Sequence, residues 1–226
     1  LGVEAFKVPS GEITNIPLLT YIAEKGKPMV VSSGMANIGE VDSAIETILQ
    51  TGNTQLVLLH CVSNYPACPD DINLRAMGTM ARAFGFPVGF SDHTLGIDVS
   101  IAAVAMGARV LEKHFTLNRH MDGPDHAASL EPEEFATLVK SVRTIEAALG
   151  DGKKRPVANE SDTAMVARKS IVARQDMPVG TVLSGELIDV KRPGTGLSPA
   201  MIPFILGRSL KMPVTQDMMI TLDMLS

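Results

Sequence analysis

Short apolar segments alternate with amphipathic segments along residues 1–150, and this alternation limits the possible folds more than any other feature. The apolar segments predict five strands, over residues 5–8, 29–31, 55–59, 87–90 and 109–111. Strands that alternate with helices form a parallel sheet, which binds its ligands at the carboxyl ends of the strands. No Gly-x-Gly-x-x-Gly follows a strand, so a (β/α) barrel is favoured over a dinucleotide-binding fold.

The chain is predicted to contain two domains of different type. An eight-unit barrel typically needs about 250 residues, so residues 1–150 are expected to be the C-terminal part of a barrel that lacks its first βα units. Residues 151–166 are polar and contain Gly and Pro, which predicts a linker. Residues 167–226 predict a small, mostly β domain, with short strands over residues 170–173, 181–183, 188–191 and 208–211.

The composition argues against several classes of partner. The formal charge is −5 and the 20 Lys and Arg residues form no basic run, which disfavours nucleic acid and acidic membrane surfaces. No apolar run reaches the roughly 18 residues that cross a bilayer. Only two cysteines and no signal peptide are present, so we expect a reduced, cytoplasmic protein with a small-molecule ligand.

Two histidines give the clearest indication of chemistry. His93 and His114 each end a predicted strand, and each follows a carboxylate closely, Asp92 and Glu112 respectively. Neighbouring strands lie about 5 Å apart, so the two imidazoles can converge on one ion. The alternative is a pair of histidines held by ordinary hydrogen bonds. Two ligands would leave coordination positions open, as a catalytic metal that polarises a carbonyl requires.

Other polar residues suggest where substrates bind. Lys7, Ser10, Ser32 and Ser91 lie at strand ends and suit a phosphate, although serines there are often simple caps. The loop 119–129 would lie above the same end of the sheet, and in it Asp125 follows a Gly-Pro pair. Arg192 lies at a Pro-Gly turn in the small domain, where an exposed, solvated arginine is the default. Cys61 is expected to be a buried structural thiol.

Seven segments resemble the bacterial sialic acid synthase family, which includes N-acetylneuraminate and legionaminate synthases. They occur in the same order and are spread along nearly the whole chain. They are KVPSGE (7–12), VSSGM (31–35), LLHCVSNYP (58–66), GFSDHT (89–94), LEKHFT (111–116), GPDHAASLEP (123–132) and KRPGTG (191–196).

The resemblance implies a TIM-type (β/α)8 barrel, here lacking its first three βα units, followed by an antifreeze-like (SAF, β-clip) domain. It implies that His93 and His114 bind a divalent metal, Mn²⁺ first, with Mg²⁺ or Co²⁺ as alternatives. It also implies roles for the remaining site residues. Lys7, Ser10, Ser32 and Ser91 would contact phosphoenolpyruvate, and Ser63, where some members carry Asn, would also bind substrate. Glu12, Tyr65 and Asp125 would line the sugar pocket, and the catalytic groups would be Glu12, Glu112 and the two histidines.

The implied reaction joins phosphoenolpyruvate, an open-chain N-acetyl amino sugar and water to give a nonulosonic acid and phosphate. The implied assembly is a domain-swapped homodimer, in which Arg192 reaches the partner's pocket. Two alternatives remain open. The enzyme could be a pseudaminate-type synthase, which the GPDHAASLEP segment supports less well, or the chain could be a non-catalytic sugar or sugar-phosphate binder.

Overall fold

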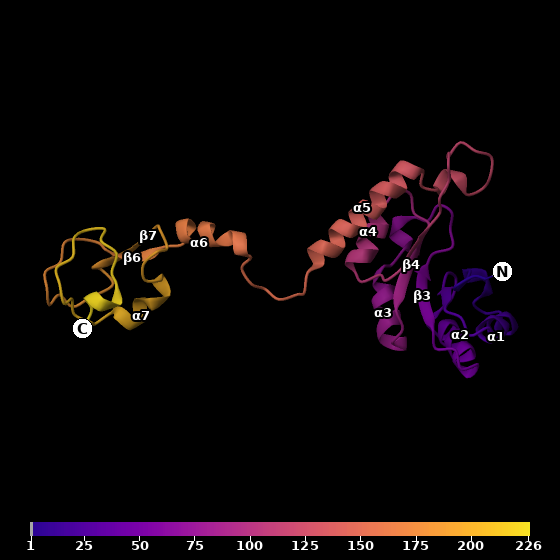
Figure 1. The fold of residues 1–226 in the computed structure, drawn as a ribbon, viewed down its shortest axis with the longest axis horizontal. Coiled ribbons are helices and arrows are strands. Elements are labelled where there is room, and N and C mark those ends of the chain that lie inside the picture. Colours follow the sequence, from indigo (N-terminus) through magenta and orange to yellow (C-terminus); the bar gives the residue numbers. More distant parts are fainter. Residues whose placement is uncertain (1) are drawn as a thin grey trace. The chain divides into compact units, whose positions relative to one another are not determined.

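A computed structural model describes residues 2–226 (Figure 1). The chain forms two compact units that divide between Gly152 and Lys153. We call residues 2–152 the sheet unit and residues 153–226 the small unit. No helix among the described residues is long and apolar enough to cross a membrane.

The sheet unit alternates strands and helices along its whole length. All five predicted strands are present, although their bounds differ by one or two residues, and the amphipathic segments between them form helices. The elements are β1 (Phe6–Val8), α1 (Ile16–Ala23), β2 (Met29–Ser32), α2 (Ile38–Gln50), β3 (Leu56–Cys61), α3 (Arg75–Phe84), β4 (Val88–Asp92), α4 (Asp98–Ala105), β5 (Leu111–Lys113) and α5 (Pro132–Leu149).

Local sequence explains where several helices begin and why one was not predicted. The Asn15 side chain accepts a hydrogen bond from Leu18 N at the start of α1, and Asn37 forms a capping box with Glu40 at the start of α2. Helix α4 has no predicted counterpart, because its IAAVA run (101–105) is apolar on every side and shows no amphipathic stripe.

The five strands form one parallel sheet in the order β1-β2-β3-β4-β5. In a flat sheet β1 and β5 would lie about 19 Å apart, given about 4.8 Å between strands. Lys7 Nζ on β1 nevertheless lies 3.3 Å from Glu112 Oε2 on β5. Side chains of this length cannot span 19 Å, so the sheet curls around the face that carries them. The result is part of a barrel; its completion to eight strands stays a prediction.

The two faces of the curled sheet differ in character. Strand register places Cys61, Ser91 and Glu112 side by side on the concave face. The opposite face packs against helices and forms the hydrophobic core, which includes the fully buried Met29, Leu58 and Phe90. The polar side chains that could bind a ligand or take part in a reaction therefore gather on the concave face.

The small unit contains one antiparallel strand pair, β6 (Ser170–Ala173) with β7 (Ile188–Lys191). The prediction of strands over residues 181–183 and 208–211 is wrong: the two segments form an isolated bridge between Val182 and Ser209. Gly180 and Gly207, both in turns with positive φ, lie next to this bridge, and their N–H groups donate to the carbonyls of Leu210 and Leu183. Two helices complete the unit, α6 (Ser161–Ala167), which lies within the predicted linker, and α7 (Ile202–Ile205).

Candidate active site

The two histidines come together just beyond the ends of β4 and β5. The ring centroids of His93 and His114 lie 5.2 Å apart, at an interplanar angle of 75°. The Tyr65 ring lies 4.1 Å from His93 and 5.3 Å from His114, so it packs against both imidazoles. Three aromatic rings from three different βα loops thus form one cluster.

Hydrogen bonding fixes the tautomer of His93. Its Nδ1 lies 2.7 Å from the carbonyl oxygen of Val62, which can only accept, so Nδ1 carries the proton. The lone pair of Nε2 then remains available for a metal ion. Burial alone would lower the pKa of His93, but its hydrogen bonds to Cys61 and Val62, together with the charge of Glu112, raise the pKa above the usual value.

His114 is the more accessible of the pair. Its Nδ1 lies 3.9 Å from Asp125 Oδ2, and about a third of its side chain is exposed. No group of three or more His, Cys, Asp or Glu residues within 2–226 is arranged to hold a metal. Two imidazoles, one with an oriented Nε2, nevertheless suit a divalent ion whose other positions take water or substrate.

A second polar cluster surrounds Gly34. The Ser10 hydroxyl accepts a hydrogen bond from Gly34 N at 2.9 Å. A side chain at position 34 would collide with both Ser10 Oγ and Ser63 Oγ, so only glycine fits here. The two hydroxyls and this backbone turn therefore form one small cradle.

A third cluster connects β1, β4 and β5 across the concave face. The Glu112 carboxylate accepts a hydrogen bond from Ser91 Oγ at 3.2 Å and pairs with Lys7 Nζ. Ser32 Oγ is buried and has no hydrogen-bond partner among the described residues. A buried hydroxyl without a partner is costly unless a ligand or water completes it, which marks this face as a binding surface.

Two further predicted site residues form hydrogen bonds of other kinds. Glu12 follows β1, and its carboxylate accepts a hydrogen bond from Asn15 Nδ2 at 2.7 Å. Arg192 belongs to the small unit, where it is exposed and its Nε donates to the carbonyl of Ala167 at 3.1 Å. The roles proposed for both residues stay predictions.

Sequence reasoning treated Cys61 as a structural residue, and its burial is confirmed. Its Sγ also lies 3.8 Å from His93 Nδ1 and 3.9 Å from Ser63 Oγ, inside the candidate site. Burial would raise the pKa of this thiol, but the hydrogen bonds to His93, Ser10 and Ser91 lower it. The available signal was the position of Cys61 just beyond the predicted strand 55–59, at the carboxyl end of the sheet, where such sites form.

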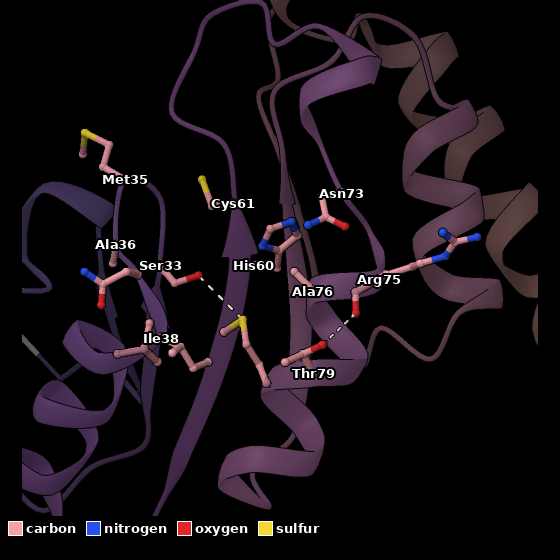
Figure 2. A pocket seen from close by; sticks show the side chains of 13 residues that line it. Ser33, Met35, Ala36, Ile38, His60, Cys61, Asn73, Arg75, Ala76 and Thr79 are labelled. Atoms are coloured by element: carbon pink, nitrogen blue, oxygen red, sulfur yellow. Dashed lines mark hydrogen bonds between the residues drawn. The ribbon is translucent and has the colours of Figure 1, made fainter.

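A separate pocket of about 580 Å³ lies on the helix side, lined by the starts of α2 and α3 (Figure 2). His60 faces this side, and its Nε2 lies 2.6 Å from the carbonyl of Ile72. His60 directly follows the predicted strand 55–59, as a site residue would, but strand alternation places it on the face opposite the candidate site.

Comparison with known proteins also divides the chain into two parts. Residues 1–154 match the NeuB family, and residues 168–226 match the SAF domain. The chain belongs to the NeuB family. It is 50% identical over 216 residues to the N,N'-diacetyllegionaminic acid synthase of Legionella pneumophila and covers 61% of that protein, using 94% of its own length. It is 41% identical over 219 residues to the human N-acetylneuraminate-9-phosphate synthase, with 96% of this chain and 61% of that protein covered.

The fold is also similar to that of a solved structure. The N-acetylneuraminic acid synthetase of Leptospira borgpetersenii superposes with a TM-score of 0.67 at 40% identity, over 72% of this chain and 56% of that one. The chain thus spans less than two thirds of the length of these relatives. Its family membership and its two-part composition confirm the expected resemblance.

Proposed function

We propose that the protein containing this chain condenses phosphoenolpyruvate with an open-chain N-acetyl amino sugar and water, which yields a nonulosonic acid and inorganic phosphate. The observation that carries the proposal is the concave face, which presents a histidine pair with one oriented ring, the cation Lys7 and the buried, unpartnered hydroxyl of Ser32. Relatives named as synthases of such acids support it.

Phosphoenolpyruvate would bind at the cation and the serine hydroxyls. Lys7 supplies a positive charge, and Ser10, Ser32, Ser63 and Ser91 supply donors around the same face. Hydrogen bonds from a charged donor to phosphate are short and strong, and several small donors can hold its tetrahedral oxygens. The pairing of Lys7 with Glu112 keeps the ammonium aimed across the concave face before the substrate arrives.

His93 and His114 would hold a divalent ion, for which we propose Mn²⁺, with Mg²⁺ or Co²⁺ as alternatives. Such an ion, when bound, polarises the aldehyde oxygen of the sugar and makes its carbon electrophilic. The Val62 carbonyl holds the His93 ring in the tautomer that this binding needs. Tyr65, packed against both rings, limits how far they can turn.

The bond changes define what the remaining residues must do. A bond forms between C3 of phosphoenolpyruvate and the aldehyde carbon, water adds at C2, and the C2–O bond to phosphate breaks. The aldehyde oxygen gains a proton and the attacking water loses one. Glu112, hydrogen-bonded to Ser91 beside Lys7, is placed to accept the proton from water.

The sugar would lie between the histidine pair and the loop 119–129. Asp125, whose carboxylate is half exposed and 3.9 Å from His114, can accept hydrogen bonds from sugar hydroxyls. Tyr65 offers a hydroxyl and a ring face, and Glu12 a further carboxylate. The acceptor is N-acetylmannosamine or a 2,4-diacetamido-trideoxy hexose; a pseudaminate-type acceptor is the alternative, since one acetamido group in place of a hydroxyl alters few contacts.

We further propose a cytoplasmic homodimer in which the small unit of one subunit serves the site of the other. Arg192 would then donate a hydrogen bond to the acetamido oxygen of the sugar. The exposed position of Arg192 in the small unit is compatible with this role. A (β/α)8 barrel completed by further residues is part of the same proposal.

The test is phosphate release from phosphoenolpyruvate by the full-length protein, with each candidate sugar and 1 equivalent or more of Mn²⁺. Release should need the sugar, and chelator should abolish it. Saturable binding of phosphoenolpyruvate and sugar without any phosphate release would instead support the non-catalytic binding alternative.

A further inference from the structure

A buried ion pair lies directly behind the histidine pair, on the helix side of the sheet. Lys113 Nζ lies 2.9 Å from Asp92 Oδ2, and the two side chains are 2% and 0% exposed. Asp92 precedes His93, Lys113 precedes His114, and the ion-pair residues are direct partners in the β4–β5 register. Because successive residues of a strand point to opposite faces, each strand end presents a charge to the helices and an imidazole to the concave face.

The ion pair also binds the backbone around His93. Asp92 Oδ1 accepts hydrogen bonds from Thr94 N at 2.8 Å and from Thr94 Oγ1 at 2.7 Å, while Lys113 Nζ donates to the Thr94 carbonyl. The residues before and after His93 are therefore both held. Ser100 Oγ donates to Asp92 Oδ2 and connects the cluster to α4.

Burial of such a pair is weak evidence for stability, because removing two charges from water costs about as much as their attraction returns. Its best-supported use is to fix one arrangement among several. Here five hydrogen bonds converge on residues adjacent to the two histidines. We propose that Asp92 and Lys113 are positioning residues, which hold His93 and His114 at the separation that a shared divalent ion requires.

This inference rests on the proposed function, since it assumes that the histidine pair binds a metal. Partners outside the ligand set typically alter metal affinity by about 10- to 100-fold when they are removed. The same range is expected for loss of the ion pair. The effect should appear in metal affinity itself, measured without substrate.

The experiment compares two double variants of the full-length protein. Asp92→Asn with Lys113→Met removes the buried pair, keeps side-chain volume and leaves no unpaired charge. Arg143→Met with Glu146→Gln removes an exposed pair on α5 as the matched control. Mn²⁺ dissociation constants are measured at 25 °C from the electron paramagnetic resonance signal of free Mn²⁺, and circular dichroism reports folding.

The buried-pair variant should stay folded and bind Mn²⁺ about 10- to 100-fold more weakly, whereas the control should change less than twofold. Visible absorption of bound Co²⁺ should also differ from wild type, since the ligand geometry relaxes. Unchanged affinity and an unchanged Co²⁺ spectrum would overturn the inference. So would failure of the buried-pair variant to fold, because the pair would then serve the fold alone. A wild-type protein that binds neither ion would instead overturn the metal site of the proposed function.

Discussion

At the carboxyl end of the sheet, the two faces differ in how completely their polar groups are hydrogen-bonded. On the helix side, both oxygens of Asp92 and the ammonium of Lys113 are buried, and each of these three atoms has a hydrogen-bond partner. On the concave side, Ser32 Oγ is buried without a partner in the described part of the chain, and the Lys7–Glu112 pair remains 35% and 39% exposed. Satisfied polar groups fix a structure, whereas incompletely satisfied ones remain able to bind a ligand.

The same contrast separates the histidines. His60 faces the helix side, and its Nε2 is engaged by the Ile72 carbonyl. His93 faces the concave side, and its hydrogen bond to Val62 uses Nδ1 and leaves Nε2 available. Residues of the same type on the same sheet are thus expected to respond very differently to substitution.

The largest effect is expected when substitution of His93 is compared with substitution of His60. His93→Gln should weaken Mn²⁺ binding by at least about 100-fold, because it removes a ligand rather than a supporting partner. His60→Gln keeps a donor and should leave Mn²⁺ affinity within a few fold of wild type. Calorimetric titration with MnCl₂ checks both, and equal losses in the two variants would remove the distinction between the faces.

A smaller effect is expected for the cation on the concave face. Lys7→Met should raise the KM for phosphoenolpyruvate by roughly 10- to 150-fold, since a charged contact to phosphate contributes ~1.5–3 kcal/mol. Mn²⁺ affinity should remain near that of wild type. Lys25→Met, at an exposed position just after α1, is the control. Kinetics that change only for the sugar would mean that the two substrate positions are reversed.

Arg192 tests whether the small unit supplies part of the site. Arg192→Ala should raise the KM for the sugar by about tenfold and affect phosphoenolpyruvate far less, as the loss of one charged hydrogen bond implies. Mixed with His114→Ala, it should regain activity, because a swapped dimer would then contain one intact site. Mixed dimers that form without any recovery would contradict the swapped arrangement.

The smallest effect concerns an exposed charge pair at the start of α5. The backbone N–H of Glu131 and then Arg119 lower the pKa of Glu134. A lowered folded-state pKa contributes stability above the unfolded pKa, and this stability is lost as the pH falls through the folded value. Glu134→Gln should therefore lower the Tm by about 1–3 °C at neutral pH.

The Tm difference between Glu134→Gln and wild type should become smaller as the pH falls through the lowered folded-state pKa of Glu134, because the carboxyl is then increasingly protonated in both states. Thermal melts across pH 3–7 measure this, with Glu133→Gln as the neighbouring control. A difference that persists unchanged at the acid end would show that the effect is not electrostatic.

Hydrophobic pattern predicted the five strands of the sheet, since each is short, apolar and followed by polar residues. It did not predict α4, whose IAAVA run has no polar face, or the reduced pairing in the small unit. Burial on several sides and turn geometry decide these elements, and neither follows from periodicity. The curl of the sheet, which the sequence predicted as part of a barrel, is confirmed by the contact between Lys7 and Glu112.

The sequence could predict those parts of the candidate site whose location depends only on where a strand ends. His93 and His114 are adjacent because consecutive parallel strands end together. The buried Asp92–Lys113 pair was not predicted, because charged side chains such as these are usually exposed. Only the cross-strand register shows that they face each other.

The most direct test of the account is the position of Mn²⁺ in crystals of the full-length protein grown with MnCl₂. An anomalous difference map collected near the manganese absorption edge would locate the ion without reference to activity. The account predicts one peak per subunit on the concave face, within ligand distance of His93 Nε2 and a ring nitrogen of His114. A peak on the helix side, or fully occupied Mn²⁺ that contacts neither histidine, would contradict it.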